Sequence, residues 1–463
     1  MKTLVLAMAA ILLALPSVSA PLAEEGQDQL CETSQSETNA AREAFFFAFP
    51  LYEMFRMRQR ALLPEGAQLN SLRHRTELSG LEDRYITTPN RDTLYSQAWL
   101  DLAEGPVRFS IPEMGERYHS AHLMNAFSDT FAVLRNETPK TRAFLIAGPE
   151  WQGEVGTNET LIRSPTRDAW LVLRTHVKND SDLAKAQRLQ LAYSLDSDTG
   201  SAGDLAFEGR IPPLPDGKQF REVVNAALAR GPIPTAQKDR LECMSATAND
   251  QIFLNDAGAT EIPEYPKLNT FIGQFFAETQ TAFEQSGELV NGWRYPPANI
   301  GTFGTDDVYR SAMALGGLAA LPIEEAISPM TNVDADDATL NGQSVYRLNI
   351  PGDMPVDGFW SLTLYESDGA GRWFFYPNEI DRYAISSASN DLHREEDGSI
   401  VVEISNQERS SSSNWLPAPN GAFRLVFRAY RPQKAFRNGE FRLPPVERDQ
   451  SNLRDPAGNE VVN

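Results

Sequence analysis

Two separate stretches of the chain consist of short apolar and aromatic runs divided by turn-forming residues, and this pattern limits the fold most. The first stretch lies between about residues 84 and 195, and the second runs from Val345 to the end of the chain. Such runs predict β-strands. Turn formers such as Pro89-Asn90 and Gly105-Pro106 divide them, which favours antiparallel β-sandwiches over a βαβ series. We therefore predict a mainly β fold with two β-sandwich domains.

Helical patterns precede and separate the two β stretches. From Thr38 to Arg60, apolar residues recur at helical spacing, and Pro50 within this segment predicts a kink or a break. In the centre of the chain, we expect helices over residues 217–231, 267–287 and about 306–321. The fold class thus includes an N-terminal helix and a central helical region.

These patterns divide the 463 residues into six parts. A chain of this length has room for two or three domains. The predicted parts are a signal peptide (1–20), a polar leader (21–40), an N-terminal domain (41–210), a helical connecting region (211–325), a C-terminal β-sandwich domain (326–435) and a tail (436–463).

The N-terminus has the three regions of a signal peptide. Met1-Lys2-Thr3 carries one positive charge, an apolar run extends from Leu4 to Leu15, and Pro16 to Ala20 supply small residues before a cleavage point. The run is shorter than the roughly 20 apolar residues that span a bilayer. We expect a periplasmic or secreted protein without a stable membrane anchor. An uncleaved anchor is the alternative, and the cleaved bond stays open.

The chain contains two cysteines, Cys31 and Cys243. In an oxidising compartment they could form one disulfide that ties the N-terminal segment to the middle of the chain. Two separate buried thiols are the alternative, because spacing alone does not show that the two Cα atoms approach each other.

The charge balance and the motifs restrict the partners. With 63 acidic and 42 basic side chains the net charge is -21, which argues against nucleic acid as a partner. His119 and His122 would point to opposite faces of a strand, so we predict no metal site there. We find no nucleotide or dinucleotide motif, and therefore expect no cofactor. A small polar molecule is the expected partner, and homo-oligomer formation is left open.

A cluster of polar side chains is the first candidate site. Asn90, Asp92, Tyr95 and Ser96, with Trp99 nearby, offer donors, acceptors and an aromatic ring that suit a sugar or another hydroxylated ligand. In an enzyme, Asp92 would be the general acid or base, and Tyr95 would stabilise charge. The alternative is structural: Asn90 and Asp92 would cap a turn through bonds to the backbone.

The second half of the chain supplies further candidates. Arg382 could clamp a carboxylate or phosphate and is the third candidate catalytic residue, with Asn378 and Tyr383 beside it. Asn414 and Trp415 begin a stiff, proline-rich loop that could form an aromatic wall. An ion pair of Arg382 with a carboxylate and a Trp415 packed between sheets are the structural alternatives.

The residues that carry these motifs also resemble two families. The stretch from Thr88 to Ser96, followed by Trp99-Leu100-Asp101, resembles domain of unknown function 1254. Phe359-Trp360-Ser361-Leu362-Thr363 and the loop from Asn414 to Pro419 resemble its companion, domain of unknown function 1214. The resemblance implies export and two β-sandwich domains of jelly-roll type with added helical elements. It implies no established activity.

Three functional readings follow. The first is an exported protein that binds a small polar or carbohydrate-like ligand in a pocket between or within its β domains. The second is a periplasmic hydrolase or lyase that acts on a polar envelope-derived or imported compound, and the third is an assembly or structural protein of the envelope. Convergence of the motif at residues 90–96 with Arg382 on one cavity would favour a ligand site. Separation would favour structural roles.

Overall fold

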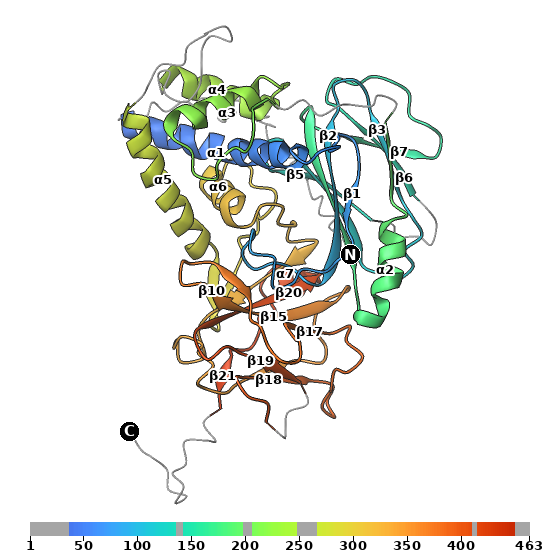
Figure 1. Ribbon diagram of the computed structural model, residues 1–463, viewed down its shortest axis with the longest axis vertical. Helices are drawn as coiled ribbons and strands as arrows, with labels where there is room; N and C mark the ends of the chain where they lie inside the picture. The colour runs from blue at the N-terminus through green and yellow to red at the C-terminus, as the bar shows by residue number, and fades with distance from the viewer. Residues whose placement is uncertain (1–36, 136–141, 198–205, 248–265, 410–413, 450–463) are drawn as a thin grey trace, which may run out of the picture.

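The fold is mainly β, with two β-sandwich domains, an N-terminal helix and a central helical region, as predicted (Figure 1). The computed structural model describes residues 37–135, 142–197, 206–247, 266–409 and 414–449. The predicted signal peptide and nearly all of the polar leader lie outside these residues. No helix in the described ranges has both the length and the apolar character needed to cross a membrane.

The N-terminal domain contains two facing sheets. The first has the order β1 (Arg73–Arg75), β2 (Thr93–Asp101), β8 (Asp168–His176), β4 (His119–Asn125) and β5 (Thr130–Leu134). The second has the order β7 (Glu159–Arg163), β6 (Arg142–Ala147), β3 (Val107–Ile111) and β9 (Ser194–Ser197). Neighbouring strands are antiparallel except β6 and β7, which are parallel. Alternate apolar residues such as Leu171, Leu173 and Phe109 fill the core between the sheets.

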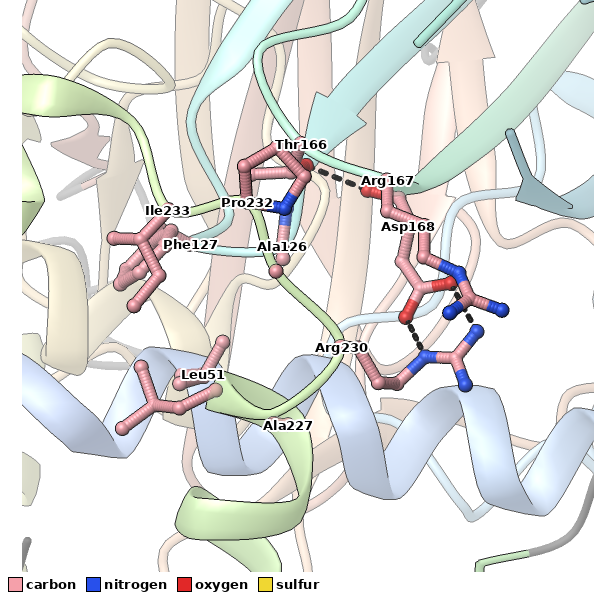
Figure 2. A pocket seen from close by; sticks show the side chains of 12 residues that line it. Leu51, Ala126, Phe127, Thr166, Arg167, Asp168, Ala227, Arg230, Pro232 and Ile233 are labelled. Atoms are coloured by element: carbon pink, nitrogen blue, oxygen red, sulfur yellow. Dashed lines mark hydrogen bonds and ion pairs between the residues drawn. The ribbon is translucent and has the colours of Figure 1, made fainter. Parts of the chain in front are cut away.

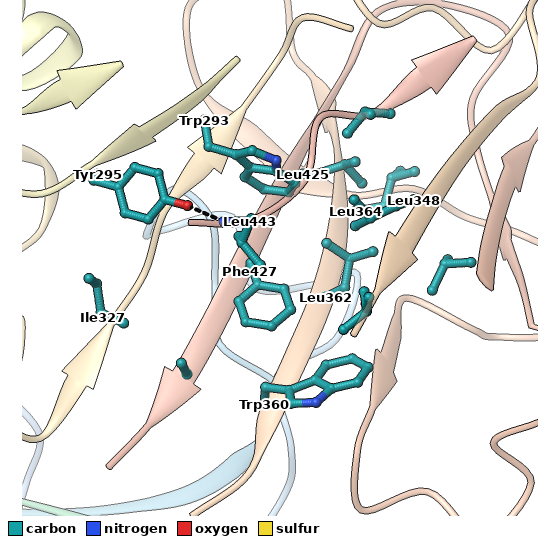
Figure 3. Packing of buried hydrophobic residues seen from close by; sticks show 14 of the residues in the cluster. Trp293, Tyr295, Ile327, Leu348, Trp360, Leu362, Leu364, Leu425, Phe427 and Leu443 are labelled. Carbon is teal, nitrogen blue, oxygen red and sulfur yellow. Dashed lines mark hydrogen bonds between the residues drawn. The ribbon is translucent and has the colours of Figure 1, made fainter. Parts of the chain in front are cut away.

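The C-terminal domain is built in the same way. Its larger sheet has the order β10 (Glu288–Val290), β11 (Trp293–Tyr295), β13 (Met330–Thr331), β20 (Phe423–Tyr430), β15 (Trp360–Ser367) and β16 (Trp373–Phe375), with β12 (Ala326–Ile327) on β20 and β17 (Ala384–Ser386) on β15. The smaller sheet has the order β19 (Trp415–Pro417), β18 (Ile400–Ser405), β14 (Tyr346–Ile350) and β21 (Glu447–Arg448). Leu362 and Phe427 of the larger sheet lie in one apolar core with Leu348 of the smaller sheet (Figure 3).

A layer of helices covers one end of the molecule. It contains α1 (Glu37–Leu62), α3 (Gly217–Leu228), α4 (Thr235–Thr247), α5 (Pro266–Gln285) and α6 (Asp307–Gly316). In Figure 1, α5 runs from this layer towards the C-terminal domain. The rings of Phe45, Phe49 and Phe220 form an aromatic core between α1 and α3. Pro50 lies inside α1 without dividing it into two helices.

Several short elements lie where the sequence suggested other structure. Strands β10 and β11 fall within the expected helical connecting region. Strand β21 and the second half of α7 (Lys434–Arg437) fall within the expected tail. The strands have only two or three residues, and the pairing of β11 with β13 and of β21 with β14 stabilises them. The remaining elements are η2 (Asp180–Asp182) and α2 (Leu183–Gln190), beside the first domain.

Candidate functional site

A cavity of about 670 Å³ lies between the two sandwich domains and the helices. Strands β1, β2 and β8 form one wall through Tyr95 and Arg174 among others, and β20 forms another through Arg428 and Tyr430. The C-terminal part of α1, the end of α5 and the segment from α6 to residue 321 close the remaining sides. The volume lies within the range of small-molecule sites in proteins, about 300 to 1,000 Å³.

Strand alternation places the functional side chains on these walls. On β8, Leu171 and Leu173 point into the core of the N-terminal sandwich, so the alternate residues Val172 and Arg174 lie on the outer face towards the cavity. On β20, Leu425 and Phe427 enter the core of the second sandwich. Their alternate neighbours, Val426, Arg428 and Tyr430, line the cavity. The site therefore lies between the outer faces of two sheets.

The charged residues that line the cavity are all basic. They are Arg60, Arg73, Arg75, Arg174, Arg294 and Arg428. His74 also lines the cavity, and no aspartate or glutamate is among the lining residues that the structure describes. Burial lowers the pKa of His74, so the arginines provide the charge. Of the six, Arg75 alone forms an ion pair with a described residue, Asp83. The cavity is thus strongly cationic within a chain of net charge -21.

Arg174 is the most buried of these arginines, with 6% of its surface exposed. Its Nη2 donates a hydrogen bond to the carbonyl oxygen of Ala319 at 2.7 Å, and its guanidinium lies 5.5 Å from the ring centre of Tyr95. Its Nη1 is buried and has no hydrogen-bond partner within the described ranges. A buried donor without a partner costs roughly 1 to 3 kcal/mol, and more when it is charged. Arg174 therefore has a free donor that a ligand could satisfy.

Asp92 joins the two domains directly behind the cavity wall. Its Oδ2 accepts a hydrogen bond from the hydroxyl of Ser361 at 2.7 Å and another from the hydroxyl of Tyr430 at 2.8 Å. The side-chain amide of Asn90 donates to the same Tyr430 oxygen at 2.7 Å. Burial and the nearby Asp92 carboxylate raise the pKa of Tyr430 well above its usual value. The phenol therefore stays protonated and donates to Asp92.

Aromatic rings extend this junction. Phe359 of the C-terminal domain stacks on His176 of the N-terminal domain, with ring centres 3.6 Å apart, and on Tyr430 at 4.3 Å. Tyr118 lies 4.9 Å from the Tyr430 ring, and its hydroxyl donates to Oε1 of Glu325 at 2.8 Å. These contacts fix the position of the two cavity walls relative to each other.

A second, much smaller cavity of about 20 Å³ lies between α1, the loop before β8 and the segment after α3 (Figure 2). Arg230 borders it and forms an ion pair with Asp168, and Arg230 Nη2 also donates to Asp101 at 2.8 Å. Its volume suits about one water molecule. The charged groups there neutralise one another, so we assign this cavity a structural role.

Comparison with protein families identifies both sandwich domains. The family described as protein of unknown function DUF1254 matches residues 69–197, and the one described as protein of unknown function DUF1214 matches residues 325–434. The chain is a two-domain protein of these families. Arg174 belongs to the DUF1254 region and Arg428 and Tyr430 to the DUF1214 region, so both families contribute walls to the cavity.

A solved structure has the same fold. The VPA0106 protein from Vibrio parahaemolyticus is 22% identical and has a TM-score of 0.68; the match covers 90% of this chain and 100% of that one. A protein from Burkholderia cenocepacia is 12% identical with a TM-score of 0.43, over 91% of this chain and 95% of that one. A search of curated proteins gave no match.

The structure divides the predicted residues of the DUF1254 region into two groups. Asn90, Tyr95 and Ser96 line the cavity. Asp92 is not among the lining residues and contacts Ser361 and Tyr430 instead. The backbone NH of Asp92 donates a hydrogen bond to Oδ1 of Asn90 at 2.7 Å within a turn. Trp99 stacks on Trp170 with ring centres 5.0 Å apart and is buried.

The predicted residues of the DUF1214 region lie away from the cavity. Arg382 forms an ion pair with Asp391 and donates to the carbonyl oxygen of Trp415. Asn378 holds the backbone of Arg382, the hydroxyl of Tyr383 donates to Asp381, and Asn414 bonds to the backbone of His393 and Val401. The indole of Trp415 donates to the carbonyl oxygen of Ser405. The two predicted motifs therefore do not share one cavity.

The sequence analysis missed Arg174, Arg428 and Tyr430. The signal was present in the strand alternation, because these three residues lie at positions that alternate with the core-facing apolar residues of their strands. Arg428 also donates to the carbonyl oxygen of Thr88 at 3.0 Å, across the domain boundary. Sequence alone did not show that the two strands face the same space.

Two further predictions concern cysteines and metals. Cys243 lies on α4 and is not a free thiol, whereas Cys31 lies outside the described residues, so their pairing stays a prediction. His119 Nδ1 bonds to the carbonyl oxygen of Arg117, and His122 Nε2 bonds to the hydroxyl of Thr130. Within the described ranges, no three histidine, cysteine or carboxylate side chains gather as a metal site.

Proposed function

We propose that the protein binds a small molecule in the cavity between its two domains. The observation that carries this proposal is the cavity itself: about 670 Å³ in volume, with polar and aromatic groups converging from both family regions. The signal-peptide pattern at the N-terminus supports a site of action outside the cytoplasm. This proposal keeps the first of the three functional readings, with the ligand between the domains. The separation of Arg382 from residues 90–96 favours a structural role for Arg382, whereas Asn90, Tyr95 and Ser96 still line the cavity.

The contacts of Asp92 support binding rather than acid–base catalysis. A general acid or base must come within hydrogen-bond reach of the reacting group. Asp92 does not line the cavity, and its Oδ2 already accepts two hydroxyl groups from the other domain. These contacts suit a residue that fixes the cavity wall.

A fluorescent reporter tests the proposal on the mature chain. The probe is 1-aminoanthracene, which is neutral at pH 7 and brightens in an apolar site. We expect saturable binding to the wild-type chain. Ala61→Trp, on α1 at the cavity wall, should abolish this binding by filling the space, whereas Ala184→Trp on the exposed face of α2 should leave it unchanged.

Met313→Trp fills the cavity from α6 and serves as a second variant if Ala61→Trp does not fold. Near-ultraviolet circular dichroism reports the fold of each variant. Lack of saturable binding to the wild-type chain contradicts the proposal, and so does unchanged binding by a folded cavity-filling variant.

A further inference from the structure

We infer that the ligand is an organic anion with an apolar body, and that Arg174 binds its charged group. This inference rests on the proposed function, because it names the class of molecule that the same cavity takes. It goes beyond the expectation of a carbohydrate-like ligand, which the sequence motif suggested.

The charge distribution is the first observation. The chain carries an excess of acidic residues, yet six arginines and no described carboxylate line the cavity. Charged groups that leave water are normally paired, since an unpaired charge loses hydration without compensation. Arg60 and Arg73 are exposed to solvent, Asp83 pairs with Arg75, and Asp92 lies near Arg428. The buried Arg174 has no carboxylate partner in the described part of the chain. An anionic ligand would supply a counter-charge for Arg174.

Arg174 is the arginine best placed to hold that charge. It pairs across the sheet with Tyr95, which in turn pairs with Arg75 on β1. Asp83 neutralises Arg75, while Arg428 lies near the Asp92 carboxylate and donates to Thr88 and Thr363. Arg174 keeps a buried Nη1 without a partner in the described ranges.

Glu325, an acid that interacts electrostatically with Arg174, already accepts hydrogen bonds from other residues. Glu325 accepts from the hydroxyl of Tyr118 at 2.8 Å through Oε1 and from Arg135 at 2.8 Å through Oε2. Burial raises the pKa of Glu325, with Arg135, Tyr118 and Arg174 acting in the opposite direction. Glu325 forms no ion pair with Arg174, so Arg174 Nη1 is left without a hydrogen-bond partner among the described residues.

Apolar side chains next to Arg174 define the rest of the ligand. Trp170 and Val172 follow one another on the same face of β8, and Met57, Phe283 and Met313 border the cavity from the helices. Methionine side chains adapt to ligands of irregular shape. Both side-chain amide oxygens of the lining already accept a hydrogen bond, because Gln97 Oε1 accepts from the indole of Trp170 and Asn90 Oδ1 from the backbone NH of Asp92. The cavity thus suits one anionic group on an aliphatic or aromatic body.

Competition against bound 1-aminoanthracene tests the inference. The competitors are 1-naphthylacetate and 1-naphthylacetamide, which have nearly the same shape and differ in charge. We expect the acetate to displace the probe from the wild-type chain at a concentration at least about tenfold lower than the amide, a free-energy difference of about 1.4 kcal/mol. Arg174→Gln should remove this preference while the amide binds as before.

Two control variants complete the experiment. Arg188→Gln makes the same charge change on the exposed face of α2 and should keep the preference for the acetate. Arg174→Lys retains a positive charge and should keep a reduced preference, which covers the case in which Arg174→Gln does not fold.

The outcomes separate the inference from the proposed function. Equal displacement of the probe by acetate and amide overturns the inference and leaves small-molecule binding intact. A preference that survives in folded Arg174→Gln overturns the role of Arg174. If the neutral probe fails to bind the wild-type chain, the proposed function itself is overturned.

Discussion

The hydroxyl of Tyr430 donates to Oδ2 of Asp92 at 2.8 Å, although 338 residues separate the two in the chain. Asp92 comes from the DUF1254 region and Tyr430 from the DUF1214 region. The same carboxylate oxygen accepts from Ser361, so one buried acid connects two strands of the second domain to a turn of the first. The polar motif of the first domain is therefore part of a junction between domains as well as a border of the cavity.

Asp92→Ala should destabilise the protein strongly. The change leaves the buried hydroxyls of Ser361 and Tyr430 without their acceptor, and an unsatisfied buried donor costs roughly 1 to 3 kcal/mol. We expect a loss of about 2 to 4 kcal/mol in the free energy of unfolding, measured by urea denaturation. Asp353→Ala, at an exposed position, should change it by less than about 0.5 kcal/mol. Equal effects of the two substitutions would show that the junction contributes little.

Strand patterns made most of the architecture predictable from the sequence. The runs at 345–350, 359–365 and 423–427 became β14, β15 and β20, because alternation of apolar residues follows the two faces of a sheet. The helix expected from Thr38 to Arg60 became α1. Strands of two or three residues, such as β13 and β21, could not be predicted, since their stability comes from partners far away in the chain.

The candidate site was only half predictable, for a related reason. A motif with many polar residues in one short stretch, such as residues 90–96, is visible in the sequence. The pairing of Tyr95 with Arg174, and the approach of Tyr430 to Asn90, depend on how strands and domains meet. Arg382 looked equally suitable by residue type, yet it contacts Asp391 and the carbonyl oxygen of Trp415 and does not line the cavity.

Arg382→Ala should leave ligand binding unchanged. Arg382 pairs with Asp391, whose side chain is 70% exposed, and it does not line the cavity. Exposed ion pairs contribute about 0 to 1 kcal/mol, so we also expect a change below about 1 kcal/mol in unfolding free energy. Fluorescence titration with 1-aminoanthracene and urea denaturation measure the two quantities. A several-fold loss of probe binding would instead place Arg382 in the ligand site.

The stability of the junction should fall as the pH drops below neutrality, and His176 should contribute to the fall. Burial, followed by the nearby Arg117, lowers the pKa of His176 to about 3, whereas the unfolded chain has a histidine pKa of about 6.5. Below pH 6.5, His176 therefore binds a proton in the unfolded state but stays neutral in the folded state, which favours unfolding. The contribution is at most about 1.4 kcal/mol per pH unit.

His176→Phe separates this titration from packing, because a phenyl ring can keep the stacking on Phe359. We expect urea denaturation between pH 7 and pH 4 to show a shallower decline for the variant than for the wild-type chain. Parallel curves for the two proteins would show that His176 takes up its proton over the same pH range in the folded and unfolded states.

A second acid-sensitive contact should act at lower pH. Two hydrogen bonds from the guanidinium of Arg117, each 2.6 Å long, hold the pKa of Asp182 down to about 2. Because the pKa of Asp182 is lower in the folded state than the value of about 3.9 in the unfolded chain, its ionised form stabilises the folded state at pH values above about 3.9. This stabilisation is lost as the pH falls towards 2. Asp182 lies near the surface, so solvent screening limits the effect to about 1 kcal/mol.

Asp182→Asn should therefore lower the unfolding free energy at pH 6 by about 1 kcal/mol, and the effect should shrink towards pH 2, where the folded wild-type carboxylate begins to be protonated. The amide keeps the size of the side chain, so the difference reports charge rather than packing. Thermal unfolding followed by circular dichroism from pH 6 to pH 2 measures the convergence of the two curves. Asp180→Asn, two residues away at an exposed position without an ion pair among the described residues, is the matched control and should follow the wild-type curve throughout. A constant gap between Asp182→Asn and the wild-type chain at every pH would mean that Arg117 holds Asp182 through geometry alone, since only the loss of a charge pair depends on protonation.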